Sequence, residues 1–348
     1  MFKAAYIEKQ NRPLVVNSFE IPDPEYGQIL VKFNNSGICG RQIQEIYGYK
    51  GEDKYLPHFL GHEGTAEVLK VGDGVSKCSK GDMVIAHWRE AKGISSVFPK
   101  YKFLNSNNYV GGGLVTTFNE IALLSENRVT KIPKNIDKEL ATLLGCSLST
   151  GLGIVNKELS VKLGSPSLVI GCGSVGLSSL IGLNLMNSYP LVSMDINIEK
   201  LNLSKKLGSN FGLNIKDLSF EEINELLISE SISGFDNIIE TTGMPKNIDL
   251  AYNLLNKEGN LCLVGQPKVN EKITLTNLQS NFQGKKIFDS QGGLTDPDMD
   301  FGNYIKLFDK YGDTFSKIIS DRCNLENINE YIEKLKTNSI VGKIILEL

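Results

Sequence analysis

Three side chains that can bind a transition metal occur at turns in the first half of the chain. Cys39 lies in SGICG, His62 in LGHEG and Cys146 in LLGCSLSTG. Two thiolates and one imidazole suit a catalytic zinc, which keeps a fourth position open for water or substrate. Glu63, directly after His62, could orient a ligand or exchange onto the metal. Ligand chemistry alone also leaves three unrelated residues as an alternative, because buried cysteines often act as small hydrophobic residues.

A glycine-rich motif, GCGSVG, indicates dinucleotide binding. Gly171, Gly173 and Gly176 follow the apolar run SLVI and precede an apolar segment of helical length. The first glycine permits a tight turn, the second lets backbone N–H groups approach a pyrophosphate, and the third lets the helix pack on the strand. With Ser174 and Val175, these residues begin a helix whose N-terminus favours phosphate groups.

An acidic residue follows at the end of the next predicted strand. Asp195 comes 19 residues after Gly176. A carboxylate there can accept hydrogen bonds from the ribose hydroxyls and would repel the 2′-phosphate of NADP. No arginine stands nearby, and Lys200 could reach the same ribose. These features predict NAD. The alternative is a glycine turn in an ordinary α/β sheet with a surface aspartate.

The elements that must position these residues fall into two regions. Residues 1–146 contain short apolar runs between glycines and prolines, which predict an irregular β-barrel or sandwich with an exposed loop at 91–113. Residues 147–289 alternate strands and helices, which predicts a parallel sheet with helices on both faces. Residues 290–348 are expected to complete the first domain. The strands expected in the second region span 167–173, 191–195, 234–240 and 259–265. One helix is expected to end near 186, a second to begin at 197, and a third to span 246–256. After residue 290 we expect helices at 301–311 and 325–336 and a last strand at 342–348.

Composition excludes several classes of protein. The 348 residues are 41% hydrophobic and 22% charged, with a net charge of -3, so neither global disorder nor a cationic surface for nucleic acid is expected. Six cysteines without a CxxC pair predict no disulfide scaffold and a reducing, cytoplasmic setting. Residues 167–186 are uncharged and about long enough to cross a bilayer, but their early glycines favour a strand, a turn and a buried helix. We therefore expect no membrane association.

The motifs GICG, GHEGTAEVLKVGDGV, GCSLSTG and VIGCGSVG, with MDINIEK after the last, occur in this order. In this combination the chain resembles the zinc-dependent alcohol dehydrogenases of the medium-chain dehydrogenase/reductase superfamily over nearly its whole length. The resemblance implies an α/β protein: a GroES-like, β-rich catalytic domain, a Rossmann domain with a doubly wound parallel sheet, and an active site between them. Relatives commonly pair through the edge of the Rossmann sheet, which implies a homodimer or homotetramer. The resemblance also implies site residues: Cys39, His62 and Cys146 as ligands of one catalytic zinc, Glu63 as the acidic residue beside it, Thr150 beside the nicotinamide, and Val264 as a backbone partner of the carboxamide.

The chain departs from the family pattern in several places. The region 87–118 contains no cysteine, so a second, structural zinc is not expected. Arg41 stands where the family usually has Ser or Thr, Gln42 where Asp is common, and Gln44 where His is often found, so the usual proton relay is missing. The arginine that commonly contacts pyrophosphate near the C-terminus is not evident, and Leu346 is expected in its place.

These residues predict the interconversion of an alcohol and its carbonyl compound, with zinc as Lewis acid and NAD as hydride carrier. Arg41 and Arg89, the latter next to Trp88, could hold an anionic substrate such as a sugar phosphate or polyol phosphate. The alternative is that Arg41 pairs with Glu63 or Glu45 and only shapes the pocket. The alcohol itself could be a sugar, a polyol or a phosphorylated alcohol.

The missing relay leaves other interpretations open. The alcohol proton would pass through water, the ribose, His58 or His87. A zinc-free quinone or enone reductase of the same superfamily is one alternative function. A non-catalytic NAD-binding protein is another, because a shared fold does not determine function.

Overall fold

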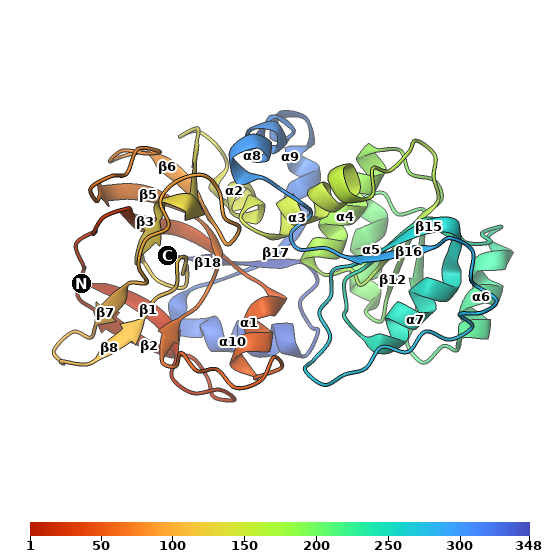
Figure 1. Ribbon diagram of the computed structural model, residues 1–348, viewed down its shortest axis with the longest axis horizontal. Coiled ribbons are helices and arrows are strands. Elements are labelled where there is room, and N and C mark those ends of the chain that lie inside the picture. Colours follow the sequence, from red (N-terminus) through yellow and green to blue (C-terminus); the bar gives the residue numbers. More distant parts are fainter. The chain divides into compact units, whose positions relative to one another are not determined.

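The computed structural model describes all 348 residues and contains two compact units. Unit 1 comprises Met1–Ser147 and Asp296–Leu348, and unit 2 comprises Leu148–Thr295. Figure 1 shows the ribbon of the chain, with helices and strands labelled where there is room.

Unit 1 is built mainly from β-strands. They are β1 (Phe2–Ile7), β2 (Val15–Phe19), β3 (Gln28–Ile38), β4 (His58–Phe59), β5 (Glu63–Val71), β6 (Met83–His87), β7 (Lys100–Lys102), β8 (Tyr109–Gly111), β9 (Ile121–Ser125), β10 (Val129–Ile132), β17 (Ile319–Cys323) and β18 (Lys343–Glu347). One sheet has the order β2-β1-β4-β8-β7, and the other has the order β10-β6-β5-β3-β18-β17, with β9 also paired to β3. The prediction of a β-rich first domain is confirmed.

The long strand β3 organises the second of these sheets. It pairs antiparallel with β5, β9 and β18, so its residues are covered on both edges. Ile29, Val31 and Phe33 are fully buried in a core with residues of β5, β6 and β9. Apolar side chains at every second position fill one face of a strand, which explains the register.

The helices of unit 1 are short and surround these sheets. They are α1 (Gly40–Ile46), α2 (Lys138–Leu144), α8 (Pro297–Lys306), α9 (Phe308–Ser316) and α10 (Ile328–Lys336). Asp137 begins α2 by accepting hydrogen bonds from the backbone N–H groups of Glu139 and Leu140. Cys146 lies directly after the C-terminal end of α2, so the position of this helix determines the position of Cys146.

Unit 2 contains one parallel sheet of six strands. They are β11 (Ser167–Ile170), β12 (Leu191–Asp195), β13 (Phe211–Asn214), β14 (Phe235–Glu240), β15 (Leu255–Leu263) and β16 (Lys286–Asp289), in the order β13-β12-β11-β14-β15-β16. The helices are α3 (Ser147–Gly153), which begins at the unit boundary, α4 (Ser174–Leu185), α5 (Ile198–Lys206), α6 (Phe220–Ser229) and α7 (Pro245–Leu254). The strand order reverses at β11, which is the doubly wound arrangement of a dinucleotide-binding fold. The predicted parallel sheet is confirmed.

Two expectations about local structure were wrong. Residues 91–113 are not simply an exposed loop, because β7 and β8 bury Tyr101 and Val110 completely. The helix expected at 301–311 is two helices that meet at Leu307. The first of these helices, α8, begins earlier than expected, because Asp296 caps a first turn that starts with Pro297.

The apolar segment 167–186 forms β11, the glycine turn and α4. None of the helices combines the length and hydrophobicity needed to span a bilayer.

Candidate functional site

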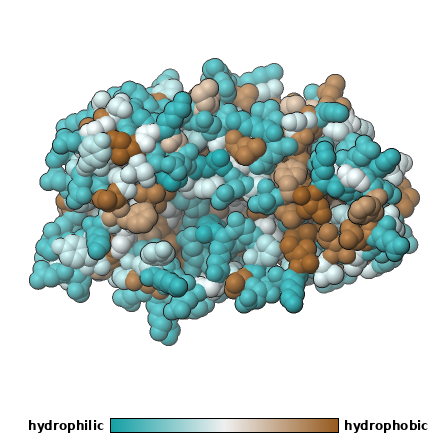
Figure 2. Space-filling model, viewed as in Figure 1, coloured by the Kyte–Doolittle hydropathy of each residue, from teal (hydrophilic) through white to brown (hydrophobic).

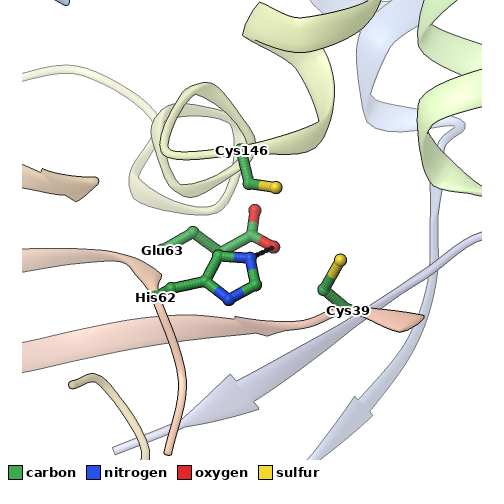
Figure 3. A group of neighbouring side chains, drawn as sticks. All are labelled: Cys39, His62, Glu63 and Cys146. Atoms are coloured by element: carbon green, nitrogen blue, oxygen red, sulfur yellow. Dashed lines mark ion pairs between the residues drawn. The ribbon is translucent and has the colours of Figure 1, made fainter. Parts of the chain in front are cut away.

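Four side chains of unit 1 converge on one point, as Figure 3 shows. The ligand atoms of Cys39, His62, Glu63 and Cys146 all lie within 4.8 Å of one another. Cys39 directly precedes α1, His62 and Glu63 lie at the start of β5, and Cys146 follows α2. The structure therefore brings together the four residues predicted to form a metal site.

A buried ion pair adjoins this cluster. Lys343, the first residue of β18, contacts Oε1 of Glu63, and neither side chain is exposed to solvent. The two strands lie on either side of β3, at the level of Gly37. A Cβ atom at Gly37 would lie 2.7 Å from both Glu63 Cδ and Lys343 Cε, so only glycine leaves room for this pair.

Lys343 was not among the residues predicted from the sequence, and Leu346 was expected at the position where relatives commonly have an arginine that contacts pyrophosphate. Leu346 is instead buried in the hydrophobic core of unit 1. The only available signal was a lysine at the start of the otherwise apolar run KIIL. Its significance depends on which strand pairs with β18, and this is not visible in the sequence.

The charges in this cluster shift one another's titration. A hydrogen bond from Cys146, helped by the Lys343 ammonium, holds the pKa of the Cys39 thiol well below its usual range, although burial opposes this. The same contact raises the pKa of Cys146. Burial raises the pKa of Glu63, while Lys343 opposes that shift. Burial alone would lower the pKa of Lys343, but Glu63 together with Cys39 and Cys146 outweighs it, and the net direction is upward. A thiolate at Cys39 is thus favoured, and a thiolate is the form that binds metal.

The residues present fit a zinc ion. Oε2 of Glu63 is buried without a hydrogen-bond partner, which is costly unless a further partner binds there. Two sulfur atoms and one imidazole nitrogen are the donors that zinc prefers in catalytic sites. Cys39, Cys146 and His62 would hold the ion, with Glu63 beside it.

Gln42 contacts two of these four residues through its side chain. Its Oε1 accepts a hydrogen bond of 2.9 Å from the backbone N–H of Cys39, and its Nε2 lies 2.8 Å from Nδ1 of His62. The other ring nitrogen, Nε2 of His62, faces Glu63 at 3.9 Å from Oε1. His62 is therefore oriented with Nε2 toward the cluster.

The two other histidines are held in structural hydrogen bonds. His87 contacts the Arg89 carbonyl oxygen at 2.7 Å and the Thr130 hydroxyl at 3.1 Å. Burial lowers the pKa of His87 to about 4, so the ring is neutral. His58 contacts the Phe59 carbonyl oxygen and Asp53, each at 2.7 Å. Both ring nitrogens of each histidine are occupied, which argues against either as a proton relay.

The arginines expected near the substrate have partners of their own. Arg41, on α1, donates from Nε to Oε1 of Glu45 at 2.9 Å. This is one of the pairings weighed as the alternative to anion binding. The guanidinium of Arg89 lies over the ring of Trp88, 5.6 Å from its centroid, and both side chains are half-buried. The charge of Arg41 is thus offset by a neighbouring carboxylate.

In unit 2, the glycine motif forms the turn between β11 and α4. Gly171 has a φ of +92°, and a Cβ atom at Gly176 would lie 1.9 Å from the Gly171 carbonyl oxygen. At Gly173 a Cβ atom would meet nothing within 4 Å, so packing within the protein does not require glycine there. Room beside Gly173 suits the close approach of a pyrophosphate. No side chain caps the first turn of α4, where Ser174 and Val175 lie.

Asp195 ends β12 next to this turn. Its Oδ2 accepts a hydrogen bond of 2.7 Å from the Cys172 backbone N–H, and Oδ1 accepts one of 2.9 Å from Asn197 N–H. Carboxylate oxygens have lone pairs left for ribose hydroxyls. Lys200 is mostly buried on α5; burial lowers its pKa, and the Asp195 carboxylate opposes that shift.

The two residues implied beside the nicotinamide also belong to unit 2. Thr150 is buried in α3. The backbone N–H of Val264 donates to the Glu240 carbonyl oxygen at 2.8 Å, so its own carbonyl is the group that could bind a carboxamide.

Exposed apolar side chains follow four strands of the unit 2 sheet. Ile196, Met244, Val269 and Leu294 follow strands β12, β14, β15 and β16, and each is substantially exposed. Figure 2 shows extensive apolar surface on unit 2. A cavity of about 270 Å³ lies between α6 and α7 and is lined in part by Ile215, whose N–H bonds to the Asp195 carbonyl oxygen. Open α/β sheets bind ligands beyond the carboxyl ends of their strands, at the point where the strand order reverses, which here is β11.

Comparison with known proteins identifies the class. The family model "Alcohol dehydrogenase GroES-like domain" matches residues 25–134, and "Zinc-binding dehydrogenase" matches residues 174–310. Alcohol dehydrogenase 6 of Peromyscus maniculatus is 24% identical over 371 aligned positions, which cover 99% of this chain and 97% of that protein. Alcohol dehydrogenase class-3 of Drosophila melanogaster is 28% identical over 302 positions, covering 80% and 79%. The crystal structure of benzyl alcohol dehydrogenase from Acinetobacter calcoaceticus matches with a TM-score of 0.87 at 22% identity, covering 100% and 99%.

The chain belongs to the zinc-type alcohol dehydrogenase family of the medium-chain dehydrogenase/reductase superfamily. It is an alcohol–carbonyl oxidoreductase of that superfamily. The predicted family and the predicted combination of a GroES-like domain with a Rossmann sheet are both confirmed.

Proposed function

We propose that this protein interconverts an alcohol and its carbonyl compound with one zinc ion per chain and NAD. The observation that carries the proposal is the convergence of Cys39, His62, Glu63 and Cys146 within 4.8 Å. Two thiols and an imidazole at this separation match the ligand set of a catalytic zinc site.

When bound, zinc would act as a Lewis acid on the substrate oxygen, and NAD would accept the hydride. The protein's own contribution is orientation and charge. Two thiolates and the Glu63 carboxylate carry three negative charges, which the ion together with Lys343 would balance. Charge balance matters here because the cluster is buried, and an uncompensated buried charge is strongly destabilising.

The nucleotide is proposed to bind unit 2 at the glycine turn. Gly173 leaves space for the pyrophosphate, and the uncapped first turn of α4 offers N–H groups to it. The Asp195 carboxylate is proposed to accept hydrogen bonds from the ribose hydroxyls and to exclude the 2′-phosphate of NADP by charge repulsion.

For the substrate, we propose a neutral alcohol, such as a sugar or polyol, in preference to a phosphorylated one. The ion pair between Arg41 and Glu45 supports this choice, because the Glu45 carboxylate offsets the positive charge of Arg41. Arg89 and Trp88 stay candidates for contact with the substrate. The homodimer or homotetramer, and the cytoplasmic setting expected from six free cysteines, also stay predictions.

The test compares Cys146→Ser with Cys78→Ser. Cys78 is a buried thiol of the same unit whose pKa is raised to about 11, mainly by burial, and it is not part of the cluster that could hold a metal ion. We expect one zinc per chain by elemental analysis in the wild type and in Cys78→Ser, with alcohol-dependent NADH formation in both. Cys146→Ser should lose the zinc and the activity.

Two outcomes would contradict the proposal. Full NAD-linked activity without zinc would favour the zinc-free reductase. Tight binding of zinc and NAD without turnover across a broad alcohol panel would favour the non-catalytic protein.

A further inference from the structure

The side chain of Gln42 connects two of the proposed zinc ligands. It is buried in α1, with Oε1 on the backbone N–H of Cys39 at 2.9 Å and Nε2 on Nδ1 of His62 at 2.8 Å. Groups that contact the second nitrogen of a metal-binding histidine determine its tautomer and its strength as a ligand. Gln42 is therefore placed to influence metal binding without touching the metal.

The chemistry of the partners determines the direction of these two hydrogen bonds. A backbone N–H can only donate, so the amide atom that faces Cys39 must be the oxygen. The amide nitrogen then faces His62, and an amide nitrogen can only donate. Nδ1 of His62 must consequently accept, and in a neutral imidazole ring the single proton lies on Nε2.

The nitrogen that carries this proton is the one that faces the metal site. Nε2 lies 3.9 Å from Oε1 of Glu63 (Figure 3), while Nδ1 is turned toward Gln42. A metal ion binds the lone pair of an imidazole nitrogen, so the proton must leave Nε2 before His62 can act as a ligand.

A neutral, metal-bound ring would then carry its proton on Nδ1, directly opposite the N–H group of Gln42. Two donors would face each other. The amide could rotate and accept from Nδ1, but its nitrogen would then face the Cys39 N–H. If the amide does not rotate, the metal-bound ring must carry no proton on Nδ1, which makes it a negatively charged imidazolate. In each case the metal-bound state loses a hydrogen bond or acquires an unfavourable ring charge, and a carboxylate in the same place would cause neither.

We propose that Gln42 is a positioning residue that weakens zinc binding at this site, so that the ion is acquired and released more readily than it would be beside a carboxylate. This inference rests on the proposed zinc site. Zinc occupancy, and with it activity, would then follow the zinc supply.

The test is Gln42→Glu, which replaces the amide with a carboxylate of the same length. Its two oxygens can accept from the Cys39 N–H and from a proton on Nδ1 of His62 at the same time. We expect zinc to bind about 10–100-fold more tightly than in the wild type, measured by competition with a chromophoric chelator. Gln44→Glu is the matched control, since it adds the same charge two residues along α1, and its zinc affinity should stay near the wild-type value.

A second measurement observes the ring directly and needs no variant. The chain has three histidines, so the imidazole nitrogens can be resolved by NMR of protein labelled with ¹⁵N-histidine. In the metal-free wild type we expect the proton of His62 on Nε2. In zinc-loaded Gln42→Glu we expect it on Nδ1.

The outcomes separate this inference from the proposed function. Wild-type protein that is folded but binds no zinc contradicts the zinc site itself. Wild-type protein that binds zinc as tightly as Gln42→Glu overturns only the role of Gln42. A metal-free wild-type ring with a proton on Nδ1, alone or together with Nε2, overturns it as well, even if the variant fails to fold.

Discussion

Lys343 and Glu63 form an ion pair in which neither side chain is exposed, although 280 residues separate them along the chain. The pair depends on β18, which lies next to β3, and on Gly37, whose missing side chain leaves the space that both groups occupy. The last strand of the chain thereby supplies a positive charge to a cluster whose other members come from the first 146 residues.

Replacing Lys343 with methionine should destabilise unit 1. The substitution leaves the Glu63 carboxylate buried beside two thiols without its counter-charge, and breaking a buried pair in this way costs about 3–5 kcal/mol. The measurement is the free energy of unfolding in urea, on protein treated with a chelator.

Two comparisons make this result interpretable. Lys70→Met removes a highly exposed ion pair with Asp23, and we expect little change from it. The double variant Glu63→Gln with Lys343→Met should recover part of the loss, because no lone charge remains. A single variant Lys343→Met as stable as the wild type would show that the pair is not a stabilising element.

His87 should make the protein less stable in mild acid. Burial lowers its pKa from 6.5 to about 4, so between these pH values the unfolded chain binds a proton that the folded chain does not. Stability therefore falls as pH decreases through this window, by about 3 kcal/mol in total at about 1.4 kcal/mol per pKa unit. His87→Gln should remove this part of the pH dependence.

The check is the free energy of unfolding of both proteins from pH 4 to pH 8. Above pH 7 the ring is neutral in both states, so the two curves should run parallel there. Equal slopes at pH 4–6.5 would contradict the assignment to His87.

Asp195 should determine the choice of nucleotide. Asp195→Asn keeps the shape of the side chain and removes its charge, so NAD should bind about 10-fold more weakly, which corresponds to about 1.4 kcal/mol. NADP should bind more tightly than in the wild type, because the repulsion of its 2′-phosphate is lost. Calorimetric titration with each nucleotide measures both changes.

Asp217→Asn provides the control for Asp195→Asn, since Asp217 is an exposed carboxylate after β13. Its affinity for both nucleotides should match the wild type. If Asp195→Asn leaves the ratio of the two affinities unchanged, Asp195 does not discriminate between them.

Arg41→Ser should affect neutral and phosphorylated alcohols by similar factors. The reason is that Glu45 already offsets the guanidinium charge, at 2.9 Å. The measurement is kcat/KM on matched pairs of alcohols with and without a phosphate group. Arg322→Ser, which removes a comparable pair with Glu139 on the surface, is the control.

A loss of more than about 10-fold confined to the phosphorylated alcohols would reverse this conclusion. It would assign anion recognition to Arg41, despite its pairing with Glu45.

The parts of the structure that follow from local chemistry could be predicted from the sequence. The glycine turn at residues 171–176 and the alternation of strands and helices after it are local patterns, and they lead to the observed parallel sheet. The residue types of Cys39, His62 and Cys146 make a metal site one of two interpretations, and the resemblance of the surrounding motifs to zinc-dependent alcohol dehydrogenases favours it.

Features that depend on distant pairing could not be predicted. To predict the role of Lys343, one would need to know that β18 pairs with β3. To predict the burial of Tyr101, one would need to know that β7 is the edge strand of a sheet. Gln42 could be recognised as unusual, but the direction of its hydrogen bonds follows only from the positions of Cys39 and His62.

The assembly of unit 1 from both ends of the chain has a consequence for biosynthesis. Residues 1–147 emerge from the ribosome before β18, and unit 2 is translated between them. Until then one edge of β3 lacks its final partner, and Glu63 lacks its cation. Domains generally fold as units while translation proceeds. A nascent or truncated chain can therefore complete unit 2 while the proposed metal site in unit 1 still lacks β18 and Lys343.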